Sequence, residues 1–223
     1  MFLVIFEVQP RPDQWDAYMS YARMLRPELE RIDGFVDNTR YRSLTRTGWI
    51  LSVSTWRDEK ALVRWRTHAQ HHLAQEKGRE VVMLDYHLRV GELAADSGWA
   101  HPQGLPQQRL DETQAGAGTA LSLTDARRSV DWLQDQPAQA VAASLGLEPH
   151  APGLVAWDVF DAVLTPGDVI LAATWRSATD AHAAVRTTAP GGGMRRREVR
   201  VVRDYGMFDR REAPQYYPEV ARR

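Results

Sequence analysis

The first half of the chain alternates between strand-like and helix-like patterns of apolar residues. The strand-like segments are rich in β-branched and aromatic residues and are bounded by Pro, Gly or Asp. Helical spacing follows Pro12-Asp13 and returns after Asp58, where Ala61, Leu62 and Trp65 share one side. The predicted order is strand 2–9, helix 13–33, strands 35–43 and 49–56, a helix from 58, further helix or an irregular turn over 68–78, and strand 79–93. This β-α-β-β-α-β order is that of a ferredoxin-like unit.

Landmarks of this first half return later in the chain at a constant distance. Thr55-Trp56-Arg57 recurs as Thr174-Trp175-Arg176, and Asp85-Tyr86 recurs as Asp204-Tyr205, each 119 positions further on. Gly34 with Gly153 and Gly48 with Gly167 keep the same spacing. Because these landmarks also keep their order, we interpret the chain as a tandem duplication of one module.

The duplication predicts the domain organisation. The first ferredoxin-like module spans residues 1–93, a linker rich in Gly and Pro spans 94–118, a diverged second module spans 119–209, and a tail spans 210–223. In the second module we expect strand 119–124, helix 125–145, strands 154–164 and 169–175, helix 177–188 and strand 195–208. The predicted fold class is α+β, with two antiparallel sheets that pack against each other as an α+β barrel.

The two predicted sheets differ in the polarity of one face. In the first module the alternation of side chains gives a face covered by helices and an opposite face that is polar, carrying Glu7, Asn38, Arg40, Ser52, Ser54, Asp85, His87 and Arg89. At the repeat offset, the second module has apolar residues instead: Trp157, Val159, Leu171, Ala173 and, at its end, Phe208. We therefore predict a cavity between the sheets with one polar and one aromatic wall, suited to a flat, partly polar organic molecule.

Composition narrows the class of protein. The chain has 223 residues, 28 basic and 29 acidic residues, a formal charge of −1 and no cysteine. This balance gives no sign of a nucleic-acid or anionic-membrane partner, and no apolar run approaches the ~20 residues of a spanning helix. Absence of cysteine excludes disulfides and fits a reducing compartment, so we expect a cytoplasmic protein.

The stretch TWRDEKALVRWRTHAQHHLAQEKGREVVMLDYHLRV resembles the antibiotic biosynthesis monooxygenase family, a member of the dimeric α+β barrel superfamily. Trp at a strand end, Trp on a helix, a turn with His, then Gly-Arg and an aromatic last strand follow in the family's order. The resemblance implies a barrel of paired ferredoxin-like units and a homo-oligomeric (dimeric) state. It also implies oxidation of a small aromatic or polycyclic, quinol-like substrate by O₂, with no metal or flavin cofactor.

Candidate roles follow from the predicted cavity. His87 is the candidate base, because imidazole titrates near neutrality, and Arg40 and Asn38 are candidates to orient a carbonyl or phenolate oxygen. Trp65 is a candidate floor of the pocket. The remaining candidate substrate contacts are Glu7, Asp85, Arg89, Trp157 and Phe208. Each of these residues also has a structural interpretation, as core packing or as a partner in an ion pair across the sheet.

Three alternatives stay open at this point. Haem-degrading members of the family use an Asn, Trp and His set, of which only Trp65 matches here, so haem binding is the alternative enzyme class. A barrel that binds a small molecule without turnover is the non-enzyme alternative. His68, His72 and Glu76 share one helical face and could bind a divalent cation, or form a solvated surface.

Overall fold

The computed structural model describes residues 1–98, 107–187 and 193–221. Its first half contains β1 (Phe2–Pro10), α1 (Trp15–Glu30), β2 (Phe35–Ser43), β3 (Ile50–Trp56), α2 (Glu59–Arg66), α3 (Ala69–Lys77) and β4 (Met83–Asp96). The second half contains β5 (Ala120–Arg127), α4 (Val130–Gln134), α5 (Ala138–Ser144), β6 (Leu154–Ala162), β7 (Asp168–Trp175), α6 (Ala178–Thr187) and β8 (Arg195–Gly206). Both halves thus have the predicted order of strands and helices.

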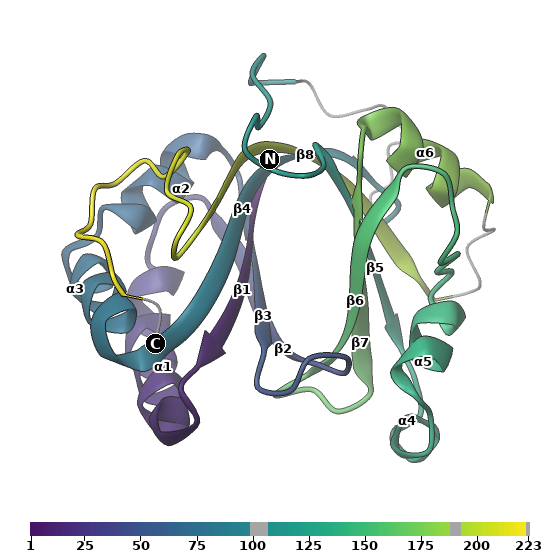
Figure 1. The fold of residues 1–223 in the computed structure, drawn as a ribbon, viewed down its shortest axis with the longest axis horizontal. Helices are drawn as coiled ribbons and strands as arrows, with labels where there is room; N and C mark the ends of the chain where they lie inside the picture. Colours follow the sequence, from purple (N-terminus) through teal and green to yellow (C-terminus); the bar gives the residue numbers. More distant parts are fainter. Residues whose placement is uncertain (99–106, 188–192, 222–223) are drawn as a thin grey trace.

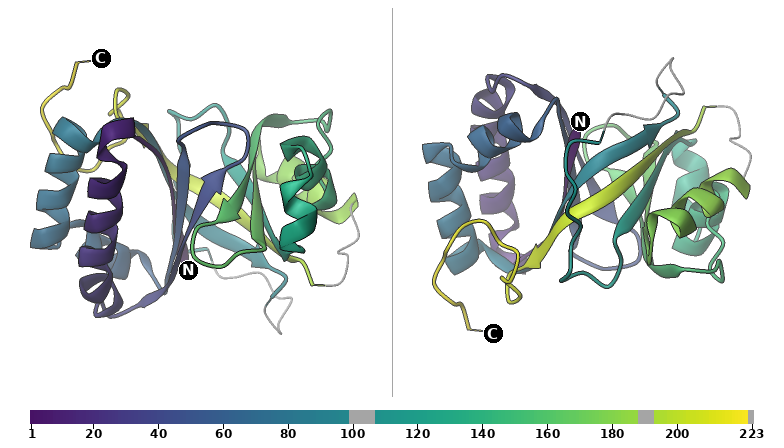
Figure 2. Two further views of the ribbon diagram at one scale, coloured as in Figure 1. Left: turned by 90° about the horizontal axis from the view of Figure 1, so that it is seen from below. Right: turned by 90° about the horizontal axis from the view of Figure 1, so that it is seen from above.

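The eight strands close into one barrel within a single chain. Their order around it is β1-β3-β2-β6-β7-β5-β8-β4, with antiparallel pairing throughout. The two halves join where β2 pairs with β6 and where β4 pairs with β8. Helices α1–α3 cover the outside of the first half and α4–α6 the outside of the second (Figures 1 and 2). The predicted α+β barrel is confirmed.

Landmarks of the proposed repeat have the same local structure in both halves. Gly34 and Gly153 have φ angles of 91° and 81°, and their carbonyl oxygens accept from the N–H groups of Arg57 and Arg176, each at 2.8 Å. A side chain at Gly34 would place its Cβ 2.6 Å from that of Ala61, so both the conformation and the space call for glycine. This equivalence supports the interpretation as a duplication.

The element boundaries differ from the expected ones in the second half. The predicted helix 125–145 consists of the two short helices α4 and α5, because residues 125–127 extend strand β5 and Pro137 precedes the second helix. In the first half, residues 78–82 form a π-helical turn before β4. Part of the predicted linker, residues 99–106, lies outside the described residues.

The interior of the barrel is a packed core rather than the predicted chamber. Inward-facing side chains of both halves form one buried cluster, which includes Leu3, Ile5, Tyr41, Leu51 and Phe160. The expected polar face combined two different faces of the sheet. The register of the strands shows which residues share a face. Arg40 pairs with Ser52 and Ser52 pairs with Phe6, and side chains at paired positions lie on the same face of a sheet.

By the same register, Asn38, Arg40, Ser52 and Ser54 lie under the helices, whereas Glu7, His87 and Arg89 belong to the barrel side. The apolar residues of the second half also face outward. Trp157, Val159 and Leu171 pack against Val141 and Leu145 of the α5 region, so burial under helices explains their character. The prediction of a cavity between the two sheets is therefore wrong.

Ion pairs inside the barrel join the two halves. Glu7 of β1 pairs with Arg89 of β4 and with Arg46, and Arg46 also pairs with Asp158 of β6 at 2.7 Å. Burial alone would raise the pKa of Glu7, but Arg89 and Arg46 hold it below its usual value. These pairs tie the β2–β3 hairpin to the neighbouring half.

We predict that Glu7→Ala lowers the free energy of unfolding by about 3–5 kcal/mol, because it leaves the buried Arg89 guanidinium without its carboxylate. Urea denaturation measures this change. Arg127→Ala is the control, since the pair of Arg127 with Asp168 is exposed and should contribute less than about 1 kcal/mol. Equal effects of the two substitutions would show that the Glu7 network adds nothing to stability.

Candidate functional site

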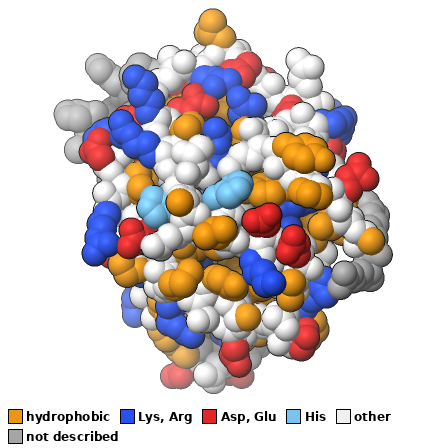
Figure 3. All heavy atoms as spheres, turned by 90° about the vertical axis from the view of Figure 1, so that its left-hand side faces the viewer, with side chains coloured by type: hydrophobic (Ala, Val, Ile, Leu, Met, Phe, Trp, Pro, Cys, Tyr) orange, Lys and Arg blue, Asp and Glu red, His pale blue; other side chains and the backbone are white. Residues whose placement is uncertain are grey.

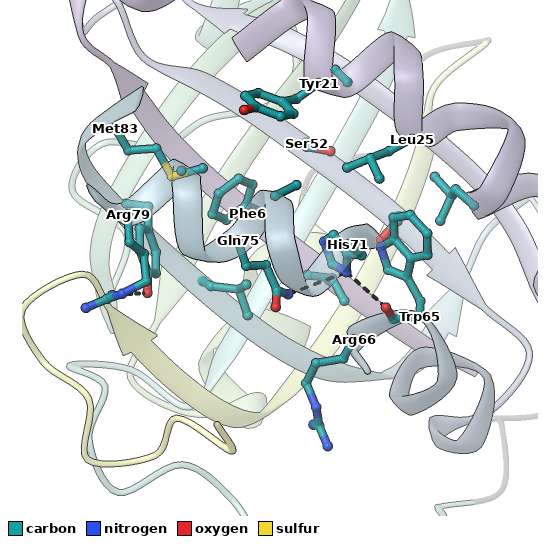
Figure 4. A pocket seen from close by; sticks show the side chains of 18 of the residues that line it. Phe6, Tyr21, Leu25, Ser52, Trp65, Arg66, His71, Gln75, Arg79 and Met83 are labelled. Atoms are coloured by element: carbon teal, nitrogen blue, oxygen red, sulfur yellow. Dashed lines mark hydrogen bonds between the residues drawn. The ribbon is translucent and has the colours of Figure 1, made fainter. Parts of the chain in front are cut away.

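A cavity of about 210 Å³ lies in the first half, between the helix layer and the outer face of the sheet. Strands β1–β4 form its floor, α1, α2 and α3 form its walls, and the segment after β8 closes one side. Figure 4 shows labelled side chains from these elements pointing toward one another around the cavity. This is the candidate ligand site.

The floor of the cavity combines apolar and polar side chains of neighbouring strands. Val4, Phe6, Leu88 and Val90 come from β1 and β4, and Asn38, Arg40, Ser52 and Ser54 come from β2 and β3. The Asn38 side-chain amide donates to Ser52 Oγ at 2.9 Å and to the Val53 carbonyl oxygen at 3.1 Å. The amide nitrogen of Asn38 is therefore already used within the sheet.

The walls come from the apolar faces of the helices. Helix α1 contributes Tyr18, Tyr21, Leu25 and Leu29, which recur every three or four residues and so lie on one side. Helix α2 begins after Asp58, whose carboxylate accepts from the N–H of Ala61 at 2.8 Å and fixes the start of the helix. Leu62 and Trp65 of this helix then face the cavity.

His71 is the histidine that faces this cavity. Its Nδ1 lies 2.9 Å from the carbonyl oxygen of Trp65, and its ring stacks on the Trp65 indole with centroids 4.2 Å apart and planes 14° apart. A carbonyl oxygen only accepts, so Nδ1 carries the hydrogen and Nε2 keeps its lone pair. Burial, with smaller contributions from the charges of His68 and His72, lowers the pKa of His71 to about 4. The ring is therefore neutral at physiological pH.

The segment after β8 lies over the cavity as a strap, here residues 209–221. Tyr217 donates to Gln75 Oε1 at 2.8 Å and lies 3.0 Å from His72 Nδ1, while Gln215 donates to the carbonyl oxygen of Arg66. Arg210 donates to the Tyr86 hydroxyl at 2.6 Å. The strap thus contacts α2, α3 and β4 together. Figure 2 shows this C-terminal segment, in yellow, beside the helices of the first half.

The outer surface over this site has mixed character. In Figure 3, histidine side chains lie near the centre of the face, among hydrophobic ones, with charged side chains around them. Met24 and Leu73 are among the exposed large apolar side chains of this helix layer.

The charged side chains that line the cavity are all basic. Its lining contains arginines but no aspartate or glutamate. Arg26 at the rim pairs with Glu30, whereas none of the other four arginines, Arg40, Arg66, Arg79 and Arg210, forms an ion pair with a carboxylate in the described part of the chain. Arg79 is 4% exposed and donates to the Tyr86 hydroxyl at 2.7 Å. The cavity therefore presents positive charge within an otherwise largely apolar lining.

Three of the predicted site residues meet in this cavity: Asn38, Arg40 and Trp65. Glu7 and Arg89 instead form a buried pair inside the barrel. His87 lies on the barrel side, 2.5 Å from Asp204 through Nε2, and its side chain is 42% exposed. A base at His87 has no access to the cavity described here, because the sheet lies between them.

The remaining predicted contacts also lie elsewhere. The Asp85 carboxylate accepts from the N–H of Tyr86, and Trp157 packs against the helices of the second half. Phe208 packs in the apolar cluster with Tyr205 and Met207, next to the strap. The cation alternative finds no support, since the described residues contain no group of three His, Asp or Glu placed to hold a metal ion.

Sequence reasoning missed His71 and the arginines Arg79 and Arg210. The helical spacing of Tyr18, Ala22 and Leu25 predicted an inner face of α1. The aromatic tail APQYYPEV suggested a strap across a module or a contact with a second chain, but the sequence did not show which module the tail covers. His71 stands beside His72 and near His68, and only the helix orientation shows which of the three faces inward.

Two β-α-β-β-α-β halves that close one barrel, with a largely apolar cavity between sheet and helices, define the class as a single-chain α+β barrel protein. The family model described as antibiotic biosynthesis monooxygenase matches residues 1–77. A curated protein of Pyricularia oryzae named jasmonate monooxygenase ABM is 49% identical over 224 residues, covering 99% of this chain and 100% of that protein. The chain belongs to the antibiotic biosynthesis monooxygenase family.

Solved structures of other proteins share the fold. A crystal structure of aldoxime dehydratase is similar with a TM-score of 0.54 and 12% identity, covering 90% of this chain and 80% of that chain. At this identity the similarity concerns the fold alone. In the described residues no helix is both long and apolar enough to cross a membrane.

We predict that the His71 ring titrates with a midpoint near pH 4 in the folded protein and shows the Nδ1–H tautomer above it. Nitrogen NMR of ¹⁵N-histidine-labelled protein measures both. Because the folded-state pKa lies below the ordinary value of 6.5, the stability that depends on the neutral ring is complete above about pH 6.5. It declines as the pH falls toward and through 4, by on the order of 3 kcal/mol, and His71→Phe should remove this decline. A midpoint near 6.5 would contradict a buried, neutral imidazole.

Proposed function

We propose that this protein is a monooxygenase whose substrate is a small, largely apolar carboxylic acid, with jasmonate as the model compound. The observation that carries the proposal is Arg40, a guanidinium at the floor of an apolar cavity with no carboxylate partner among the described residues. A partly buried cation without a counter-ion is unfavourable, and a bound anion relieves that cost.

The surroundings of Arg40 favour a carboxylate in particular. Its Nε is buried and has no hydrogen-bond partner. The nearby Tyr18 hydroxyl stays protonated, because burial raises its pKa although Arg40 acts in the opposite direction. A planar carboxylate can accept two parallel hydrogen bonds from a guanidinium, which fixes its orientation as well as its position.

The relative from Pyricularia oryzae supports this class of substrate. Its name assigns it jasmonate, which is the anion of a small, mostly hydrocarbon keto acid, and the similarity extends over the full length of both chains. Such a molecule has the two features that the cavity complements: one negative charge and an apolar body. The walls formed by Phe6, Leu25 and Trp65 provide contacts for that body.

The proposed binding mode places the carboxylate at Arg40 and the hydrocarbon part between the sheet and helices α1 and α3. The strap then covers one side of the substrate and limits its contact with water. Exclusion of water protects oxygenated intermediates from side reactions and strengthens polar contacts in the cavity.

Oxygenation without metal or flavin remains part of the proposal. In such a reaction all the electrons come from the substrate. A CH₂ group next to an electron-withdrawing carbonyl loses a proton to give an enolate or phenolate, the carbanion carbon adds O₂ and a proton to give a hydroperoxide, and loss of water leaves a second carbonyl group, so no external reductant is needed. The protein then contributes binding, orientation and a dry cavity. The quinol-like aromatic substrates expected from the sequence meet the electronic requirement but lack the carboxylate that Arg40 favours.

A haem cofactor fits the observed cavity poorly. The free Nε2 of His71 is chemically able to bind haem iron. However, a volume of about 210 Å³ lies below the ~300–1,000 Å³ of pockets that enclose drug-sized ligands, and a porphyrin is a large member of that class. The residues present thus favour a smaller molecule, and a haemin titration with the visible spectrum as readout tests this directly.

Substrate-dependent O₂ uptake tests the proposal. We expect uptake with jasmonate, in the presence of a metal chelator and without added flavin, and little uptake with its uncharged methyl ester or with a reduced naphthoquinol. Turnover of the quinol but not of jasmonate would overturn the proposed substrate class. Turnover of jasmonate only after addition of a metal or flavin would overturn the cofactor-free route.

We predict that Arg40→Met lowers kcat/KM for jasmonate about ten- to a hundredfold, because it removes a charged hydrogen bond that contributes about 1.5–3 kcal/mol. Arg42→Met on the same strand is the matched control. Arg42 is largely exposed, pairs with Asp161 and does not line the cavity, so its replacement should leave kcat/KM within about twofold. Similar losses in both variants would argue against an anion site at Arg40.

A further inference from the structure

One ring nitrogen of His71, Nε2, can accept a hydrogen bond but receives none from the described residues. The other nitrogen, Nδ1, is committed to the Trp65 carbonyl oxygen. Figure 4 shows the imidazole between Trp65 and Gln75 on the wall of the cavity. An acceptor nitrogen that opens onto a largely apolar cavity is best satisfied by a bound molecule that donates to it in place of water.

The neighbouring Gln75 does not supply that donor. The Gln75 amide nitrogen lies 3.4 Å from Nδ1, the nitrogen that already carries hydrogen, and Gln75 Oε1 accepts from Tyr217. The strap therefore fixes Gln75 in an orientation that does not serve Nε2. Stacking on Trp65 also fixes the plane of the imidazole, so the ring cannot turn to find another partner.

Arg40 and His71 thus differ in the hydrogen-bonding partner that each one lacks. Arg40 offers donors and calls for an acceptor, whereas His71 offers an acceptor and calls for a donor. A ligand that satisfies both carries a carboxylate and, apart from it, an O–H group. Two further polar groups of the lining are already engaged within the protein, the amide nitrogen of Asn38 and the guanidinium of Arg79.

We propose that Nε2 of His71 accepts a hydrogen bond from a hydroxyl or enol O–H of the substrate, so that the protein selects hydroxy acids and keto acids bound as their enols. This inference rests on the proposed function, because it assumes an acid held by Arg40. It assigns His71 a contact with the substrate that discriminates between acids of equal size. A ketone presents an O–H group only as its enol, so the contact also favours the electron-rich form that reacts with O₂.

Two matched ligands separate this contact from the carboxylate contact. The probes are naphthoate and a hydroxynaphthoate with its hydroxyl on the ring remote from the carboxylate, with dissociation constants measured by calorimetry. We expect the wild-type protein to bind the hydroxynaphthoate about tenfold more tightly, as one added hydrogen bond predicts. In His71→Phe the aromatic ring remains to stack on Trp65, and the two ligands should bind with equal affinity to within about twofold.

His68→Phe is the control variant. His68 also stacks on Trp65, with centroids 5.7 Å apart, but it does not line the cavity, so its replacement should preserve the tenfold preference. The methoxy analogue tests the same contact without any substitution in the protein. It lacks the O–H donor and should lose the preference, which keeps the proposal testable if His71→Phe does not fold.

The outcomes distinguish this inference from the proposed function. If the tenfold preference persists in His71→Phe, the proposed contact of His71 is wrong. If Arg40→Met binds both ligands more weakly than the wild-type protein does, the proposed anion site at Arg40 is supported, whatever the result for His71. If neither ligand binds the wild-type protein, or if Arg40→Met binds both unchanged, both proposals fail. Equal affinity of the wild-type protein for the two ligands overturns the His71 contact alone.

Discussion

Closure of the barrel determines where this protein can bind a ligand. Each strand of a closed barrel has one side toward the interior, and here the inward side chains of both halves interlock in a single buried cluster. Side chains that fill an eight-stranded barrel leave no room for a substrate. The ligand site therefore lies outside the barrel, between the sheet and its own helix layer, in the first half, where Asn38 and Arg40 lie on the floor of a cavity.

The difference between the two halves follows from this constraint. In the second half, Trp157 and Val159 fill the space under α5, and the helix layer packs directly on the sheet. In the first half, the corresponding positions are Asn38 and Arg40, and the longer helices α1 and α3 stand over them. One half is thus a packed partner that completes the barrel, while the other carries the site. The strap from the end of β8 links them, since the last strand of the second half leads into the segment that covers the cavity of the first.

The architecture could be predicted from the sequence because it depends on two signals that the sequence contains: local periodicity of apolar residues and an internal repeat. Periodicity located the strands and the main helices, and the constant offset between Trp56 and Trp175 indicated two similar halves. The sequence was insufficient for the site because faces of neighbouring strands are related by register, which alternation along one strand does not reveal. Arg40 and Asn38 were recognised as unusual polar residues in a sheet but were assigned to the barrel side, to which Glu7 and His87 do belong. The positions of His71 and the strap depend on tertiary contacts.

The central claim is that an acid binds under the helices of the first half with its carboxylate at Arg40. Crystals grown with a bromonaphthoate, measured at the bromine absorption edge, test it most directly. The account predicts an anomalous peak between α1, α3 and the outer face of the sheet, with the carboxylate within hydrogen-bond distance of Arg40. A bromine peak inside the barrel, or a ligand whose carboxylate points to solvent, would contradict it.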